Sequence, residues 1–194
     1  MMHPDTEIQF ISKEIGYGVV ATKNLPRGTI TWVLDELDQA YTPSQVRNMH
    51  PAIQEVINKY SFRNNQGNFV LCWDSAKFVN HSFKSNCLST AYDFEIAIRD
   101  IKKGEELTDD YGYLNVTEAF VPKEENTFRK VVYPNDLLNY YKNWDRELKK
   151  VFRDIETVNQ PLIDLIPKTV EEKMKKVLKG EEELDSILNL YYRT

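Results

Sequence analysis

The chain has 194 residues, of which 41% are hydrophobic and 28% are charged, and its formal net charge is −5. This length suits one domain with an appendage or two small domains, and the composition is typical of a globular protein with a core. The acidic excess argues against nucleic acid as the main ligand and is compatible with a cationic substrate. No apolar run approaches the ~18 residues that a membrane span needs.

The N-terminus and the cysteine content bear on the compartment. Residues 1–5 contain neither a basic region nor an apolar stretch, so they do not predict a signal peptide. The two cysteines, Cys72 and Cys87, are too few for a disulfide framework or a cysteine-based zinc site. We therefore expect an intracellular protein, cytoplasmic or alternatively nuclear, with no membrane partner.

Short strand-like runs separated by glycine and proline dominate the N-terminal part. Ile8–Ile11, Val19–Thr22 and Thr29–Val33 are such runs, and they predict an irregular β fold rather than βαβ units. Residues 21–29 (ATKNLPRGT) and 97–105 (AIRDIKKGE) form a weak internal repeat. In each copy an apolar residue fills a corner and a glycine permits the turn. Two such corners predict small sheets folded against each other.

A helical insert is predicted at residues 42–60. Its first residues, Thr42-Pro43-Ser44-Gln45, combine an N-cap, a proline at the first helical position and a capping-box glutamine. Pro51 should divide the insert into two short helices. A strand is predicted at Phe69–Trp73 and another at Thr90–Ile98.

From Pro134 onward the pattern indicates helices. One apolar stripe with helical spacing contains Leu137, Leu138, Tyr141, Trp144, Leu148, Val151, Phe152 and Ile155. Thr169–Glu172 has the form of a second capping box, and Gly180 should end the helix that it begins. Residues 181–192 are expected to form a short final helix.

A polar cluster, Asn80-His81-Ser82, lies between the two central strands, where a chain without a site would place core residues. It also fits an N-glycosylation pattern, which would require a secreted protein, and a turn in which Asn80 and Ser82 bond their own backbone. A metal site of His81 with His50 or Cys87 lacks any recognised ligand spacing. The cluster alone does not distinguish these alternatives, and other motifs are needed to assign it a function.

Three segments, in order, resemble the signature of SET-domain protein-lysine methyltransferases. Gly16-Tyr17-Gly18, with the corner after it, resembles the first motif. Phe78–Ser82 with Asn86-Cys87 resembles the Asn-His-Ser motif, and Glu106–Gly112 resembles the Glu-Leu-Thr…Asp-Tyr-Gly motif. The resemblance covers residues 16–113, about half of the chain.

The resemblance implies a β-rich α+β fold, the SET or β-clip fold of small sheets with a threaded crossing. Residues 1–115 would form the SET domain, with its helical insert at about 42–60. Residues 116–134 would be a zinc-less post-SET-like segment, and residues 135–194 a C-terminal helical extension.

The implied activity is transfer of a methyl group from S-adenosylmethionine to the side-chain amine of a lysine in a protein substrate, a histone or another protein. The substrate would present an exposed lysine, for example on a basic tail, and no direct contact with nucleic acid is expected. The residues implied to bind the cofactor are Gly16, Tyr17, Gly18, Asn80, His81 and Tyr111.

Tyr111 is also the implied catalytic residue, because the matching tyrosine lies where the cofactor meets the lysine channel. It is no obvious base, since a phenol has a pKa of ~10. A narrow apolar channel and the neighbouring sulfonium would instead favour loss of the lysine proton. Tyr60 and Tyr113 are candidates for the substrate channel, although core packing is the commoner role of such tyrosines.

The chain departs from many relatives in its zinc ligands. Phe83 stands where a cysteine is usual, and residues 114–129 contain none of the other three cysteines, so no zinc is expected. We expect Phe83 to pack near Phe128, with an apolar contact in place of the metal. Four aromatic residues of the tail are candidates to cover the cofactor or complete the channel, unless they only pack helices: Phe120, Tyr140, Tyr141 and Trp144.

Two other functions fit the sequence. One is a catalytically inactive SET module that binds peptide or cofactor as an interaction scaffold, and the presence of Tyr111 argues against it. The other is a non-enzymatic β-clip domain, for which the Asn-His-Ser motif would be accidental. The substrate protein, the number of methyl groups transferred and the oligomeric state do not follow from the sequence.

Overall fold

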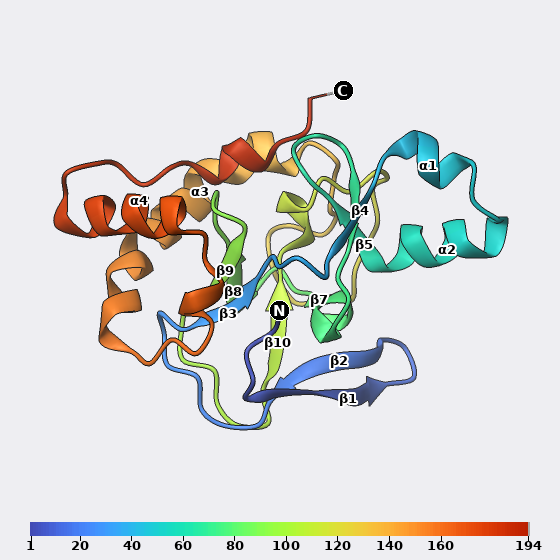
Figure 1. The fold of residues 1–194 in the computed structure, drawn as a ribbon. Helices are drawn as coiled ribbons and strands as arrows, with labels where there is room; N and C mark the ends of the chain where they lie inside the picture. Colours follow the sequence, from blue (N-terminus) through green and yellow to red (C-terminus); the bar gives the residue numbers. More distant parts are fainter. Residues whose placement is uncertain (194) are drawn as a thin grey trace.

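The computed structural model describes residues 1–193, and three small sheets form its centre (Figure 1). The strand orders are β1-β2-β10-β7, β3-β9-β8 and β4-β6-β5. The strands are β1 (Thr6–Ser12), β2 (Gly16–Ala21), β3 (Ile30–Val33), β4 (Gln39–Tyr41), β5 (Ser61–Arg63), β6 (Phe69–Leu71), β7 (Asn80–His81), β8 (Cys87–Ser89), β9 (Phe94–Ala97) and β10 (Glu106–Asp109). The predicted β-rich α+β fold is confirmed.

Helices form the insert and the C-terminal part. The α-helices are α1 (Pro43–Arg47), α2 (Pro51–Tyr60), α3 (Asp136–Val151) and α4 (Lys168–Lys179). The 3-10 turns are η1 (Ser75–Phe78), η2 (Tyr111–Tyr113), η3 (Phe152–Thr157), η4 (Ile163–Leu165) and η5 (Ile187–Leu190). No helix within residues 1–193 combines the length and the apolar character that crossing a membrane would require.

The two copies of the internal repeat pair with each other. The backbone N–H of Leu25 donates to the carbonyl of Ile101, and the N–H of Ile101 donates to the carbonyl of Leu25, both over 2.8 Å. Gly28 and Gly104 follow them with φ angles of 92° and 84°, a region that favours glycine. The corners therefore fold the sheets against each other, as the repeat predicts.

Residues 80–86 wrap around strand β10. Strand β7 pairs with β10 in parallel, so that Asn80 lies opposite Thr108 and His81 opposite Asp109. The buried side chain of Asn86 then accepts a hydrogen bond from the N–H of Thr108 and donates to the carbonyl of Glu106. This double attachment fixes the direction in which the chain leaves β10 towards Tyr111.

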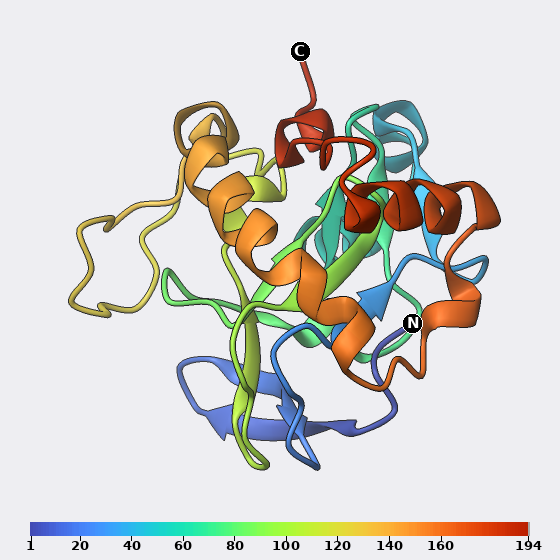
Figure 2. The same ribbon diagram turned by 90° about the vertical axis from the view of Figure 1, so that its left-hand side faces the viewer.

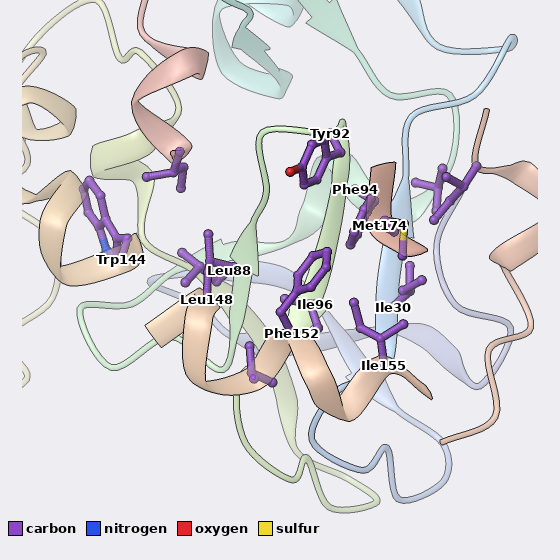
Figure 3. Close-up of a cluster of buried hydrophobic side chains, with 14 of the residues drawn as sticks. Ile30, Leu88, Tyr92, Phe94, Ile96, Trp144, Leu148, Phe152, Ile155 and Met174 are labelled. Carbon is purple, nitrogen blue, oxygen red and sulfur yellow. The ribbon is translucent and has the colours of Figure 1, made fainter. Parts of the chain in front are cut away.

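The C-terminal helices cover the β3-β9-β8 sheet and complete its core (Figures 2 and 3). Side chains of the sheet meet side chains of α3, η3 and α4 in one buried cluster, which includes Ile30, Leu88, Phe94, Ile96, Leu148, Phe152, Ile155 and Met174. The apolar stripe expected after Pro134 thus faces the sheet, except for Leu138, which is exposed. The regular α-helix ends at Val151 and continues as a 3-10 turn.

Three local expectations had different outcomes. The insert is split at Pro51, and Thr42 forms the predicted capping box with Gln45. The second capping box is wrong, because Pro167 occupies the N-cap position and α4 begins before Thr169. Gly180 does end α4, with a φ of 75°.

The expected final helix over residues 181–192 is also wrong. Only η5 forms there, because Asp145 of α3 accepts hydrogen bonds from the Ser186 hydroxyl and the N–H of Ile187. These bonds dock the short turn on α3. The chain then continues extended towards β5, where Tyr192 contacts Arg63.

Candidate active site

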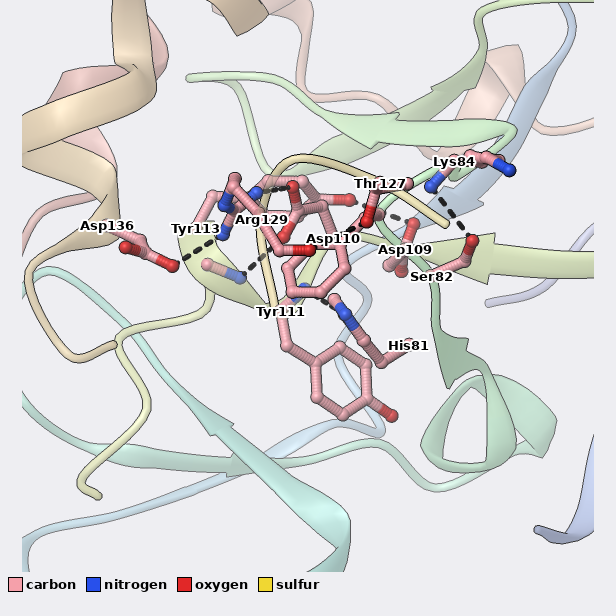
Figure 4. A network of polar contacts seen from close by, with 12 residues as sticks. His81, Ser82, Lys84, Asp109, Asp110, Tyr111, Tyr113, Thr127, Arg129 and Asp136 are labelled. Carbon is pink, nitrogen blue, oxygen red and sulfur yellow. Dashed lines mark hydrogen bonds and ion pairs between the residues drawn. The ribbon is translucent and has the colours of Figure 1, made fainter. Parts of the chain in front are cut away.

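Tyr111 is bonded to the segment around Asn80 and His81 through both its backbone N–H and its side-chain hydroxyl. Its backbone N–H donates to Nδ1 of His81 over 3.1 Å, and its hydroxyl donates to the carbonyl oxygen of Val79 over 2.6 Å. The side chain of Asp110 caps the short turn η2 by accepting from the N–H of Gly112 (Figure 4). The phenol ring is therefore held by two motifs that are distant in sequence.

Tyr111 and His81 both stay neutral at neutral pH. Burial raises the pKa of Tyr111 well above its ordinary value, and the nearby carboxylates of Asp109, Glu95 and Glu106 raise it further. Burial lowers the pKa of His81 to about 4, and Arg129 acts in the same direction. Because Nδ1 of His81 accepts a hydrogen bond, its proton lies on Nε2, which is buried without a partner.

The glycine motif meets the other two motifs through Asn80. The amide nitrogen of Asn80 donates to the carbonyl oxygen of Tyr17 over 3.0 Å and to Oε1 of Glu106 over 2.7 Å. A Cβ on Gly18 would lie 2.3 Å from Oε1 of Glu106 and 2.8 Å from Nδ2 of Asn80. A side chain at Gly18 would therefore collide with the other two motifs.

Gly16 and Tyr17 have different surroundings. Gly16 has a φ of 88°, and a Cβ placed on it would meet nothing within 4 Å. The Tyr17 side chain is 57% exposed and makes edge contacts with the rings of Phe10 and Phe78. The start of β2 thus combines open space with an accessible aromatic ring.

A cavity of about 350 Å³ lies against Tyr111 and extends between the insert and the segment after η2. Tyr60 and Tyr113, the two candidates for the substrate channel, also line it. Tyr113 is 1% exposed, and its hydroxyl donates to Oδ1 of Asp109 over 3.0 Å, so it belongs to the inner wall. Of the four aromatic residues considered in the tail, Phe120 lines the cavity.

The expected contact between Phe83 and Phe128 is wrong. Phe128 is 98% exposed, whereas Phe83 packs edge-on against His81, with 4.6 Å between the ring centroids, and against the guanidinium of Arg129 at 4.6 Å. A flat guanidinium satisfies both an aromatic face and carboxylates, which a second phenylalanine could not do. Arg129, rather than Phe128, fills the place that we assigned to the apolar contact.

Arg129 joins the segment between η2 and α3 to the rest of the molecule. Its guanidinium forms ion pairs with Asp110, next to Tyr111, and with Asp136, at the start of α3 (Figure 4). It also lies over the ring of Tyr140 at 4.5 Å and near Trp144 at 5.7 Å. Tyr140 and Trp144 therefore pack against Arg129. Within the part of the chain that the structure describes, no group of three side chains that could hold a metal ion occurs.

Sequence reasoning missed one feature of the cavity. Glu95 of β9 and Asp109 of β10 are buried and both line it, so its wall is not uniformly apolar, in contrast to the channel expected above. The signal was present in the sequence, since Asp109 places a second acidic residue directly before the Asp-Tyr-Gly motif.

Comparisons with known proteins agree with the geometry. A family model described as SET domain matches residues 16–112, which include the glycine motif, the Asn-His-Ser cluster and Tyr111. A search of curated proteins found no match for the chain.

Proposed function

Because this chain belongs to the SET-domain family, we propose that it is a protein-lysine N-methyltransferase that uses S-adenosylmethionine. One observation carries the proposal. The Tyr111 hydroxyl is tied to Val79 at the wall of a cavity, directly beside the Asn80 contact that joins the glycine motif to Glu106. Val79 and Tyr111, from two of the three motifs, therefore line a cavity that is large enough for a side chain, and Asn80, next to Val79, contacts the glycine motif.

The residues present fit the proposed cofactor. Gly16 borders open space, Tyr17 offers an exposed ring, and His81 has a buried N–H donor without a partner. The carboxylates of Asp109 and Glu106, which raise the pKa of Tyr111, make the region negative, which suits a sulfonium cation. Together with Gly18, Asn80 and Tyr111, these residues would hold the cofactor, and it would supply the methyl group as a sulfonium substituent.

Tyr111 would position the reacting groups rather than act as a base. Methyl transfer is an in-line displacement, so its rate depends mainly on alignment and charge. The raised pKa keeps the phenol protonated, and the bonds to His81 and Val79 fix its orientation. The protein contributes a rigid hydroxyl at the boundary between the two binding regions.

The substrate amine would enter through the cavity between the insert and the segment after η2, past Tyr60. We propose a protein substrate with an exposed lysine as the partner and an intracellular site of action. The aromatic residues at the cavity, Tyr60, Phe62 and Phe120, suit the alkyl part of a lysine side chain.

Calorimetric titration with S-adenosylmethionine, followed by methyl transfer to mixed protein lysate, tests this function. Native protein and Tyr111→Phe should both bind the cofactor at micromolar concentration, and only the native protein should label lysate proteins. The matched control is Tyr41→Phe, whose ring lies on β4 outside the cavity and which should label at the native rate.

Each alternative function has its own outcome. Cofactor binding without labelling of any lysate protein by the native chain would favour the inactive scaffold. Absence of cofactor binding would remove the methyltransferase proposal and leave a shared fold alone. Equal labelling by the native protein and Tyr111→Phe would remove the role given to the hydroxyl.

A further inference from the structure

Two carboxyl groups in the cavity wall act on the pKa of Tyr111, but no contact with the substrate has been assigned to them so far. Glu95 is 8% exposed and Asp109 is 4% exposed, and their carboxyl groups are hydrogen-bonded to each other. The Ser89 hydroxyl donates to Glu95 and the Tyr113 hydroxyl donates to Asp109, each over 3.0 Å. Two acids from adjacent sheets thus form one buried unit.

This unit holds a single negative charge at neutral pH. Burial raises the pKa of both acids, most strongly for Glu95, which keeps its proton and donates it to Asp109. Arg129, the cation of the neighbouring network, is already engaged by Asp110 and Asp136. A buried charge without a cationic partner is costly, so its presence indicates a ligand that supplies the opposite charge.

Trp32 gives a second, independent indication of a ligand. It is 6% exposed and lines the same cavity, and its Nε1 atom is buried without a hydrogen-bond partner. It lies opposite Glu95 in the register of β3 and β9, with the ring of Phe62 packed edge-on at 6.0 Å. Buried polar groups are normally paired, so an unpaired donor in a cavity wall marks a place that a ligand or water completes.

We propose that Glu95, Asp109 and Trp32 form a subsite for the alkylammonium group of the substrate, with the Glu95–Asp109 pair as its counter-ion. Aromatic rings beside a carboxylate are the chemistry that recognises ammonium groups, methylated ones included. Methylation leaves the positive charge in place, so the same subsite takes the amine before and after transfer. The subsite rests on the proposed function only in naming lysine as the source of the ammonium group.

The experiment uses n-butylammonium as the probe and the indole N–H resonance of Trp32 as the reporter. In native protein the probe should shift this resonance in a saturable way, while the resonance of the exposed Trp73 stays unchanged. Neutral n-butanol, of nearly the same shape, should bind at least about tenfold more weakly, because it lacks the charge. No cofactor and no turnover are needed.

Two variants isolate the charge. Glu95→Gln keeps the Asp109 carboxylate and an amide donor beside it, so it should bind n-butylammonium within about threefold of native protein. The double variant Glu95→Gln, Asp109→Asn removes the charge and should lose at least about tenfold in affinity, while n-butanol binding stays the same. Native-like affinity of the double variant for n-butylammonium would overturn the proposal, as would equal binding of the two probes by native protein.

Native protein alone decides the question if the double variant does not fold. Lowering the pH from neutral by about two units should protonate the pair and weaken n-butylammonium binding but not n-butanol binding. Of the other titratable groups at the cavity, Tyr111, Tyr113 and Cys72 stay neutral across this range because burial raises their pKa values. Burial also raises the pKa of Asp93, so Asp93→Asn is the control for its protonation. The remaining charged residues of the lining are Lys59, Arg63, Lys77 and Glu118. His81 beside the cavity gains positive charge only near pH 4.

An unchanged affinity for n-butylammonium on acidification would count against the subsite. The two proposals also fail separately. A chain that binds n-butylammonium through the pair but labels no protein keeps the subsite and loses the methyltransferase function. A chain that labels protein equally well with and without the charged pair keeps the function and loses the subsite.

Discussion

The hydroxyl of Tyr111 donates a 2.6 Å hydrogen bond to the carbonyl oxygen of Val79, the residue directly before Asn80. This bond links the last of the three sequence motifs to the middle one, and the Asn80 amide continues the link to the backbone of Tyr17. The candidate catalytic residue is therefore held by a main-chain atom of the segment that we propose to bind the cofactor. Movement of either motif would move the hydroxyl.

Tyr111→Phe should separate activity from stability. The substitution leaves the Val79 carbonyl without its partner, which should lower the free energy of unfolding by about 1–3 kcal/mol. Methyl transfer should fall by more than this loss explains, to the detection limit at a temperature where the variant is folded. Urea unfolding and labelling of the same preparation check both. Retained activity in a destabilised variant would show that the hydroxyl serves the fold alone.

Two glycines of the first motif should respond differently to alanine. At Gly18 the new methyl group would overlap Glu106 and Asn80, so Gly18→Ala should break the contact between motifs and weaken cofactor binding at least about tenfold. At Gly16 there is room, and the cost should be the backbone strain of a φ of 88°, about 1–2 kcal/mol of stability. Calorimetry and urea unfolding distinguish the two effects. Equal cofactor affinity in both variants would contradict the placement of Gly18.

Much of this arrangement was accessible from the sequence, because its signals are local. The capping box at Thr42, the break at Pro51 and the glycine-containing corners each depend on neighbouring residues. The motif spacing indicated which segments belong to the site. The family resemblance supplied the topology, since a parallel pairing of Asn80 with Thr108 has no local signature.

The parts that the sequence did not reveal depend on tertiary contacts. Phe128 and Arg129 are neighbours, and only the direction of the chain after residue 127 decides that the arginine points inward. The final helix does not form because Asp145, far away in sequence, holds the chain at Ser186. The pairing of Asp109 with Glu95 likewise depends on the contact between two sheets, which the sequence does not show.

Arg129 should be a principal stabilising residue of the region that zinc shapes in many relatives. Arg129→Met would leave Asp110 and Asp136, both almost fully buried, without a cation, at a cost of about 3–5 kcal/mol in the free energy of unfolding. Arg129→Lys keeps the charge but cannot bridge two carboxylates in fixed geometry, so it should lie between native protein and Arg129→Met.

Treatment with a chelator tests the expectation that the protein binds no zinc. Treatment with a strong chelator should leave the melting temperature of native protein unchanged, because the network around Arg129 contains no metal ligand set. Equal stability of Arg129→Met and native protein would show that the network contributes nothing. A chelator-dependent fall in the melting temperature would show that a metal does.

His81 should make the protein sensitive to mild acid. Burial lowers its pKa to about 4 from an ordinary 6.5, so between these pH values the unfolded chain binds a proton and the folded protein does not. The contribution of His81 to stability should therefore fall as the pH drops from 6.5 towards 4 and stay constant above 6.5, by an amount on the order of 1–3 kcal/mol. The raised pKa values of Asp109 and Glu95 act in the opposite direction, so the His81 contribution is measured as a difference between native protein and a His81 variant. Burial lowers the pKa of His3 as well, which adds to the slope.

His81→Gln removes this titration and keeps an acceptor for the Tyr111 N–H, so native protein should lose stability relative to this variant as the pH falls through that window. His3→Gln is the matched control for the contribution of the other buried histidine. Urea unfolding of the three proteins at several pH values gives the slopes. A native slope that survives in His81→Gln and disappears in His3→Gln would assign the effect to His3 instead.

Asn115 should determine whether the C-terminal segment closes the cavity. Its buried amide nitrogen donates to the carbonyls of Arg63 and Leu190 over 2.9 and 2.8 Å, and its oxygen accepts from the N–H of Tyr192 over 3.0 Å. One side chain thus ties strand β5 and the C-terminal segment to the chain directly after η2. Leu190 itself lines the cavity, so this attachment shapes the binding region.

Asn115→Ala should lose these three bonds and also strain the backbone, because Asn115 has a φ of 50°. Asn115→Gly loses the same bonds without the strain, so it should be more stable than the alanine variant by about 1 kcal/mol. Both variants should bind n-butylammonium more weakly than native protein, because the Leu190 side of the cavity is no longer held. If both variants bind the probe as native protein does, the C-terminal segment stabilises the fold without forming the site.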